Sequence, residues 1–197
     1  LKPDQVVGGA LEPDAMDMDV HAIHQGFLKG MRRQGGALVC DADITSLQYD
    51  GTLWHVHAAD GRCWSARVVV NAAGIWGQRI AEYADLRIAM FPAKGSLLIL
   101  DHRINRQVIN RCRKPADADI LVPGDTISLI GTTSEHIPYE EIDDNRVTTA
   151  EVDTLLREGE KLAPVLGRTR MLRAYSGVRP LVASDDDPSG RSVSRGI

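Results

Sequence analysis

The sequence predicts a mixed α/β (α+β) fold with two regions of different character. Residues 68–74, VVVNAAG, form a β-branched run that ends in small residues, which is typical of a buried parallel strand whose carboxyl end approaches a ligand. After about residue 86, short strand-like segments follow one another with turn residues between them, as in an antiparallel sheet. We therefore predict a partial Rossmann-like region followed by an antiparallel-sheet region.

One amphipathic helix is predicted near the start of the first region. Asp19 is a suitable N-cap, and apolar residues then recur at helical spacing until Gly35-Gly36 ends the helix. These apolar positions are Val20, Ile23, Phe27, Leu28 and Met31. The stripe predicts a helix that packs on a sheet.

Strand-like segments follow this helix. They cover residues 37–40, 53–58 and 63–71. Asp50-Gly51 and Asp60-Gly61 are tight hairpin signals, so we expect a meander inserted between two parallel strands. A short helix is expected beyond Trp76, running to about Tyr83.

The second region is predicted to contain a helix among antiparallel strands. The strand-like segments are residues 88–91, 96–100, 120–122 and 127–130. Pro123-Gly124-Asp125 supplies a turn between the last two. Thr148 and Glu151 form a capping box that opens a helix, Pro164 closes that helix, and a final strand reaches Leu181.

Composition restricts the class of protein. With 43% hydrophobic and 25% charged residues, the sequence is typical of a soluble globular protein. The net charge of -4 gives no electrostatic footprint for nucleic acid or an anionic membrane surface. No apolar run reaches the roughly 18 residues that a spanning helix needs. Three widely spaced cysteines, Cys40, Cys63 and Cys112, argue against a disulfide framework and favour a reducing cytoplasm.

Five sequence blocks occur in an order that points to one family. They are VVVNAAGIWG, MFPAKGSLLIL, ILVPGDTISLIGTTSE, YSGVRPL and SRGI. In these blocks, residues 68–197 closely resemble the FAD-dependent glycerol-3-phosphate dehydrogenases, and among them the catalytic subunits of the anaerobic bacterial type. Residues 1–67 resemble the wider D-amino-acid-oxidase-like superfamily, in the stretch LEPDAMDMDVHAIHQGFLKGMRRQGG.

The resemblance implies a D-amino-acid-oxidase-like fold divided near residue 86. Residues 1–85 would form a partial FAD-binding region, 86–183 a substrate-binding region with an antiparallel sheet, and 184–197 the start of a return segment. Family members begin with a G-x-G-x-x-G loop that holds the FAD pyrophosphate, and this sequence has no such loop. It also starts at Leu1 without a methionine. We therefore expect an internal fragment of a longer enzyme.

The resemblance also implies cofactor-binding residues. The backbone around Ala72, Ala73 and Gly74 would lie against FAD, with Trp76 just beyond it. Ile44 matches the position whose main chain meets the adenine. The alternative for Ile44 is an ordinary core residue.

Two arginines match positions that contact the substrate anion in the family. Arg179 stands directly before a proline, so its guanidinium could offer a fixed fork to an anion. Arg195 matches a second arginine, although a solvated terminal residue is the alternative. Lys94 would reach the flavin or the substrate, or lie in a surface turn, and Thr132 would bond to substrate or cap a strand end. Leu97 stands where aerobic relatives carry a histidine, so no general base is assigned.

No metal site is predicted. The pairs His21–His24 and His55–His57 have spacings compatible with zinc, but nothing in the sequence brings a third ligand to either pair. The run 185–187 of three aspartates lacks the spaced pattern of a calcium loop and is expected to form a solvated turn.

The resemblance implies FAD-dependent oxidation of sn-glycerol 3-phosphate to dihydroxyacetone phosphate, with electrons passed to a quinone. The anaerobic family works with a second flavin subunit plus an iron–sulfur membrane-anchor subunit, so we expect a cytoplasmic protein held at the inner face of the plasma membrane by partners. The first alternative is a related oxidase or dehydrogenase of an amino acid, N-methyl amine or 2-hydroxy acid, since an arginine binds carboxylate as readily as phosphate. The second is a folded fragment without flavin or activity of its own.

Overall fold

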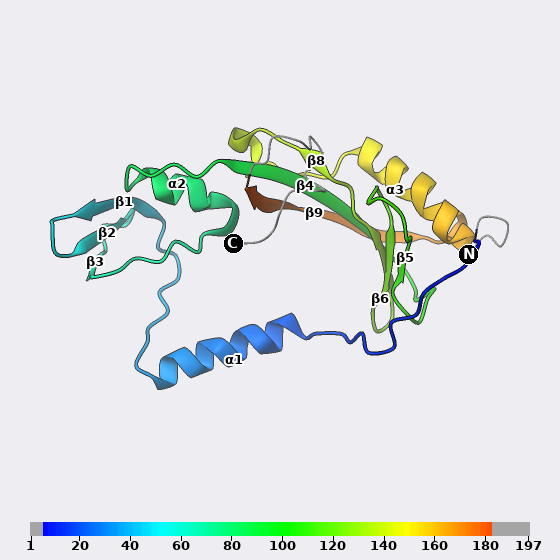
Figure 1. The fold of residues 1–197 in the computed structure, drawn as a ribbon, viewed down its shortest axis with the longest axis horizontal. Helices are drawn as coiled ribbons and strands as arrows, with labels where there is room; N and C mark the ends of the chain where they lie inside the picture. The colour runs from blue at the N-terminus through cyan, green and yellow to red at the C-terminus, as the bar shows by residue number, and fades with distance from the viewer. Residues whose placement is uncertain (1–5, 183–197) are drawn as a thin grey trace.

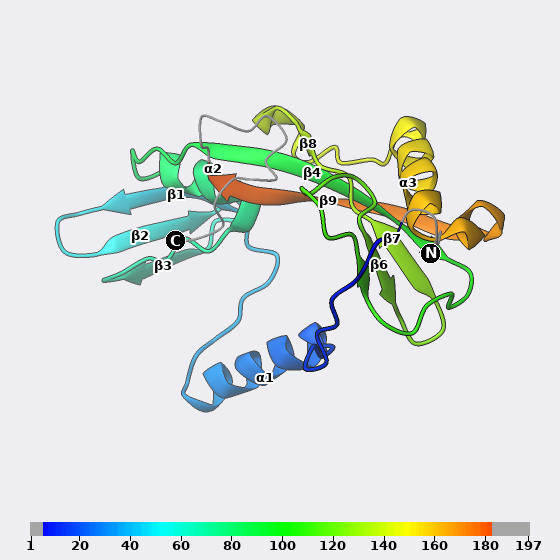
Figure 2. The same ribbon diagram turned by 45° about the vertical axis from the view of Figure 1, so that its right-hand side comes forward.

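Two antiparallel sheets and the helices beside them make up the computed structural model, which describes residues 6–182. The long strands β4 (Met90–Leu100) and β9 (Met171–Val182) run side by side through the middle of the molecule (Figure 1). A three-stranded sheet lies near one end of this pair, and helix α3 (Thr149–Leu162) lies near the other (Figure 2). The central pair therefore lies between the three-stranded sheet and α3.

The first sheet is the predicted meander. Its strands, in the order β1-β2-β3, are Ile44–Tyr49, Trp54–Ala58 and Cys63–Ala66. Gly51 and Gly61 have φ angles of 96° and 87° at the two turns, where a residue without Cβ is favoured. The Asp50 carboxylate accepts the backbone N–H groups of Thr52 and Leu53, each at 2.8 Å. The two hairpin predictions are confirmed.

Two predicted strands of the first region are wrong. Residues 37–40 and 68–70 have no strand assignment and take part in no strand pairing within the described part of the chain. A strand requires a neighbour to complete its hydrogen-bond ladder, and all pairings among residues 6–182 are antiparallel ones between other segments. Val68 and Val70 are 73% and 81% exposed, so the run predicted as a buried parallel strand is uncovered here.

Helix α1 (Val20–Arg33) forms as predicted, with Asp19 capping its first turn. Its predicted packing is not observed. Val20, Ile23 and Phe27 are 69%, 47% and 76% exposed, and α1 contains no buried residue. Both views show the helix standing apart from the two sheets (Figures 1 and 2). No element described by the structure supplies the apolar surface that this stripe would cover.

The second sheet has the order β5-β6-β7-β4-β8, with β9 on the other edge of β4. Its shorter strands are β5 (Ile109–Asn110), β6 (Ile120–Pro123), β7 (Ser128–Gly131) and β8 (Glu135–His136). β4 joins two segments that the sequence predicted as separate strands. Within β4, Pro92 lies opposite Pro180 of β9, so the two residues without N–H groups face each other.

Helix α3 covers one face of this sheet, and its capping box is confirmed. The Thr148 hydroxyl accepts the Glu151 N–H at 3.3 Å, and the Glu151 carboxylate accepts the Thr148 N–H at 2.8 Å. The apolar side of α3 and the following turn η4 (Pro164–Arg168) pack on β4, β6 and β7. The main core residues are Leu98, Leu100, Leu121, Ile130, Leu155 and Leu166. Between residues 6 and 182, no helix is both long and apolar enough to cross a membrane.

Candidate functional site

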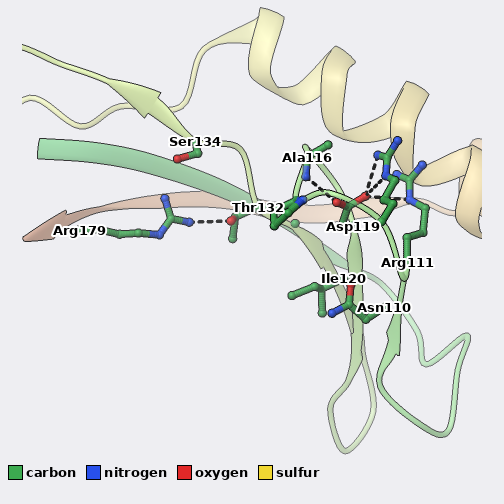
Figure 3. A pocket seen from close by; sticks show the side chains of 11 residues that line it. Asn110, Arg111, Ala116, Asp119, Ile120, Thr132, Ser134 and Arg179 are labelled. Carbon is green, nitrogen blue, oxygen red and sulfur yellow. Dashed lines mark hydrogen bonds and ion pairs between the residues drawn. The ribbon is translucent and has the colours of Figure 1, made fainter. Parts of the chain in front are cut away.

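Arg179 and Thr132, two of the residues predicted to bind substrate, are in contact. The Arg179 Nη2 group donates a hydrogen bond to the Thr132 hydroxyl at 2.6 Å and approaches the Thr133 carbonyl oxygen at 3.4 Å. Arg179 lies on β9 opposite Ala93 of β4, whereas Thr132 directly follows β7, on the other side of β4 (Figure 3). The guanidinium therefore reaches across β4 and is oriented by the segment beyond it.

Arg179 and Thr132 line a cavity of about 240 Å³. Further lining comes from the segment that connects β5 to β6, including Arg111, Arg113 and Asp119, and from Ser134. Such a volume is on the scale of a small metabolite, and the lining offers hydroxyl and guanidinium donors. The cavity is therefore suited to a small anion-bearing molecule.

Two arginines at the far wall of this cavity share an acidic partner. Arg113 donates to the Asp119 carboxylate through Nε at 2.9 Å and Nη2 at 2.7 Å, and Arg111 Nε lies 2.9 Å from the same oxygen (Figure 3). Arg111 Nη2 also donates to the Glu158 carbonyl of α3 at 3.0 Å. Arg111 therefore ties the connecting segment to α3. Residues 110–120 were not singled out in the sequence, because nothing in their spacing indicates that they face Arg179.

Lys94 does not join Arg179. Ala93 pairs with Arg179, so both point to one face of the sheet, and the next residue, Lys94, points to the opposite face. There Lys94 Nζ lies 2.8 Å from Glu151 Oε2 and donates to the Arg146 carbonyl oxygen at 2.5 Å. The Lys94 and Glu151 side chains are each only 7% exposed. The alternative of a surface turn is therefore wrong. The buried ion pair also keeps the ammonium away from the cavity, on the other face of the sheet from Arg179.

Glu151 is the centre of a buried polar network that joins α3 to β4. Its carboxylate accepts hydrogen bonds from Ser96 Oγ at 2.6 Å, from Lys94, and from the backbone and hydroxyl of Thr148. Burial raises the pKa of Glu151, but the hydrogen bonds from Lys94, Ser96 and Thr148 outweigh that effect and lower the pKa to about 2. The sequence revealed only the capping role of Glu151, because Lys94 lies 57 residues away.

This network is expected to make stability depend on pH in acid. The folded pKa of Glu151 lies below its ordinary value of 4.5, so the stabilisation is complete above pH about 4.5 and is lost as the pH falls towards 2. Its size is on the order of 3 kcal/mol. Melting temperatures of the protein and of Glu151→Gln, measured from pH 6 to pH 3.5, should converge as the pH falls. A difference that stays constant over this range would contradict the assignment.

The segment expected to hold FAD forms an exposed turn ahead of helix α2 (Gly77–Glu82). The Asn71 side chain folds it, accepting the Ala73 N–H at 3.2 Å and donating to the Gly77 carbonyl at 2.8 Å. Gly74 has a φ angle of 57°, and a Cβ built on it would meet no heavy atom within 4 Å. Exposed backbone with open space above a glycine fits the close approach of a large cofactor.

Trp76 and Ile44 lie at the edges of this part of the structure. Trp76 ends the short helix η2 (Gly74–Trp76) and is 45% exposed, and its indole N–H donates to the Asp143 carboxylate at 2.9 Å. Ile44 is half-buried and is the first residue of β1, opposite Ala58. Both cofactor assignments stay predictions.

The second predicted substrate arginine, Arg195, lies outside the described residues. The same holds for the predicted return segment 184–197 and for the aspartates at 185–187. Among the described residues, no group of three or more His, Cys, Asp or Glu side chains is arranged to hold a metal ion.

Comparison with known proteins places the whole chain in one family. The model of the FAD dependent oxidoreductase (DAO) family matches residues 1–197. The chain is 62% identical over 198 residues to an anaerobic glycerol-3-phosphate dehydrogenase subunit of Escherichia coli K12, covering 98% of this chain and 36% of that protein. The corresponding protein of Haemophilus influenzae is 57% identical over 203 residues, covering all of this chain and 36% of that protein.

Solved structures show the same fold at low sequence identity. Glycine oxidase from Geobacillus kaustophilus aligns with a TM-score of 0.65 and 23% identity, over 75% of this chain and 38% of that one. L-Proline dehydrogenase from P. horikoshii aligns with a TM-score of 0.66 and 18% identity, over 84% of this chain and 44% of that one. These likenesses support the predicted D-amino-acid-oxidase-like fold.

The similarity to these dehydrogenase subunits also corrects one sequence-based expectation. Because it covers 98% of the chain, residues 1–67 resemble the same relatives as residues 68–197, and not only the wider superfamily. The chain spans 36% of the length of these curated relatives. The match of the family model over residues 1–197 shows that the chain belongs to the FAD-dependent oxidoreductase (DAO) family.

Proposed function

We propose that this chain provides the substrate-anion site and part of the FAD site of an enzyme that oxidises sn-glycerol 3-phosphate to dihydroxyacetone phosphate. The observation that carries the proposal is the Arg179 guanidinium, held by Thr132 at the wall of a small cavity. The 62% identity to a subunit of anaerobic glycerol-3-phosphate dehydrogenase favours a phosphate as the anion. A carboxylate would suit an isolated arginine equally well, and a glycine oxidase is built on the same fold.

In this reaction bound FAD would be the oxidant, and the residues of the chain would bind and orient the cofactor and the substrate. The exposed backbone of Ala72, Ala73 and Gly74 would lie against the cofactor, with Trp76 and the main chain of Ile44 as further contacts. Arg179 would hold the phosphate through charge-assisted hydrogen bonds, and Thr132 would fix the direction of its guanidinium. The phosphate lies away from the reacting carbon, C2. Binding the substrate through its phosphate therefore leaves C2 free to face the flavin.

Cofactor binding and substrate binding would be divided at the predicted boundary near residue 86. Residues 1–85 would serve the cofactor, and residues 86–183 the substrate. The uncovered apolar faces of α1 and of residues 68–70 would then pack on a part of the FAD-binding domain outside this chain, which spans 36% of the length of its relative. Arg195 and residues 184–197 would complete the substrate site and the return to that domain.

Relatives that are named as one subunit of an enzyme imply an assembly with other subunits. The partners proposed are a second flavin subunit together with an iron–sulfur subunit, which anchors the complex at the inner face of the plasma membrane. Electrons would leave the flavin for a quinone through these partners. The proposed location is therefore cytoplasmic, at the membrane surface.

Thr132→Val in the flavin-loaded enzyme is expected to raise KM for glycerol 3-phosphate by about 10-fold or more while leaving kcat within a few-fold. Valine keeps the shape of threonine but removes the hydroxyl that accepts from Arg179, and hydrogen bonds to charged groups contribute about 1.5–3 kcal/mol. Steady-state kinetics measures both constants. Thr132→Ser is the control, because it retains the hydroxyl. Equal KM values for the enzyme and the valine variant would show that this hydrogen bond does not orient Arg179 for substrate.

Anaerobic titration of the flavin-loaded enzyme tests the proposed function. Glycerol 3-phosphate should bleach the flavin absorbance at low concentration, whereas glycine, proline and 2-hydroxy acids should leave it oxidised. Bleaching by an amino or hydroxy acid, and not by glycerol 3-phosphate, would contradict the phosphate assignment and favour the carboxylate alternative.

A further inference from the structure

We propose that Gly95 is a positioning residue for Arg179. Because Gly95 has no side chain, the Arg179 guanidinium can lie directly against β4, and we call the space that it occupies over Gly95 the seat. The inference rests on the proposed function, in which Arg179 binds the substrate anion. It assigns a role in substrate affinity to a glycine, which has no side chain that could contact the substrate. Gly95 would act only through the direction that it allows Arg179 to take.

The seat follows from the register of β4 and β9. Arg179 is paired with Ala93, and Gly95 lies two residues further along β4, so all three share one face of the sheet. Figure 3 shows the Arg179 side chain extending from β9 towards Thr132. Its guanidinium passes over Gly95, because a Cβ built on Gly95 would have the guanidinium atoms as its nearest neighbours. A Cβ built on Gly95 would lie 2.6 Å from Arg179 Nη1 and 2.7 Å from Cζ, and closer still to Nη2. The guanidinium therefore occupies the space that any other residue would fill.

The close fit belongs to Gly95 and not to its neighbour across the ladder. Gly177 is paired directly with Gly95, yet a Cβ built on Gly177 would meet no heavy atom within 4 Å. The observed position of Arg179 therefore leaves no room for a side chain at Gly95, but it does not restrict Gly177. The backbone of Gly95 lies within a regular strand and has no positive φ angle.

An alanine at Gly95 should displace the guanidinium and leave the fold intact. Every atom that its methyl group would meet most closely belongs to the far end of the flexible Arg179 side chain, and none of these atoms is backbone. A strand interior also accepts alanine without a backbone penalty relative to glycine. The guanidinium would have to leave its seat, and its hydrogen bond to Thr132 would be lost or redirected.

The test compares Gly95→Ala with Arg179→Met and with the double variant in the flavin-loaded enzyme. Gly95→Ala is expected to raise KM for glycerol 3-phosphate by about 10-fold or more, with kcat, flavin content and melting temperature close to those of the unsubstituted enzyme. In the Arg179→Met background, Gly95→Ala should change KM by less than about twofold, because the group that it displaces is already gone.

Gly167→Ala is the matched control. A Cβ on Gly167 would also crowd the tip of a flexible charged side chain, lying 2.6 Å from Glu160 Oε1, but this site is in η4, away from the cavity. Its KM should be unchanged.

The outcomes separate this inference from the proposed function. An unchanged KM in Gly95→Ala, together with a large rise in Arg179→Met, would overturn the seat and leave the proposed function standing. Additive effects of the two substitutions would also overturn it, since Gly95 would then act independently of Arg179. An unchanged KM in Arg179→Met would contradict the proposed function itself. A rise in Gly95→Ala that disappears in the Arg179→Met background would support the seat.

Discussion

Arg179→Met is expected to raise KM for glycerol 3-phosphate by about 100-fold or more in the flavin-loaded enzyme, the largest effect on activity of any substitution considered. Methionine is similar in length but removes the charge and every donor of the guanidinium. Truncating one partner of a hydrogen-bonded charge pair costs about 2–5 kcal/mol, and each 1.4 kcal/mol corresponds to a tenfold change in affinity. Arg179 would bind the phosphate both in the enzyme–substrate complex and in the transition state. Removing it weakens both, so kcat/KM should fall by at least the same factor.

Arg179→Lys separates charge from geometry. Lysine keeps the positive charge but lacks the planar fork of donors, so it should recover only part of the lost affinity. Arg157→Met is the control for removing one positive charge, because Arg157 is on the outer surface of α3 with its side chain 65% exposed. Steady-state kinetics on all three variants measures the effect. A KM for Arg179→Met within a few-fold of that of the unsubstituted enzyme would contradict the assigned role.

Glu151→Leu is expected to destabilise the protein by about 3–5 kcal/mol, the largest effect on stability. The substitution leaves the Lys94 ammonium in a site where its side chain is 7% exposed, without its carboxylate partner at 2.8 Å. Breaking a buried ion pair by removing one partner has a cost of this size. It also removes the capping box with Thr148 and the acceptor of the Ser96 hydroxyl. The melting temperature should fall by several degrees, and amide exchange in α3 should accelerate.

The double variant Lys94→Met, Glu151→Leu provides the comparison. Replacing both members of a buried ion pair by apolar side chains is often neutral or stabilising, so most of the lost stability should return. If the double variant is less stable than Glu151→Leu, the unpaired ammonium cannot be the cause of the destabilisation. A melting temperature of Glu151→Leu equal to that of the unsubstituted protein would show that the network contributes nothing measurable.

Features set by a few adjacent residues could be predicted from the sequence. The capping box of Thr148 and Glu151, the Asp19 cap and the turns at Gly51 and Gly61 all formed as expected. Each depends on a side chain that satisfies nearby backbone groups, or on a glycine that permits a positive φ angle. Their physical cause is contained within a few residues, so no knowledge of distant segments was needed.

Features that depend on residues far away in the sequence could not be predicted from the sequence. Residues 68–70 have the composition of a buried strand, but no strand in the described part of the chain pairs with them. The burial of Lys94 against Glu151 depends on where α3 crosses β4, whereas the sequence suggested contact with the flavin or the substrate, or a surface turn. The apolar stripe of α1 correctly indicated a helix but could not show what covers it.

The candidate site shows the same division. Arg179 and Thr132 were selected through family resemblance, and the structure places them in contact. Gly95 gave no signal of its own in the sequence, because its importance lies in the diagonal path of a side chain from the neighbouring strand. Likewise, nothing indicated that Arg113 and Asp119 would line the same cavity as Arg179.

A crystal structure of the flavin-loaded enzyme with glycerol 3-phosphate would test the central claim most directly. We expect the phosphate to accept hydrogen bonds from the Arg179 guanidinium, with that guanidinium still over Gly95 and bonded to Thr132, and with C2 of the substrate facing the flavin. A phosphate bound instead at Arg111 and Arg113, or at a position that Arg179 does not reach, would contradict the account.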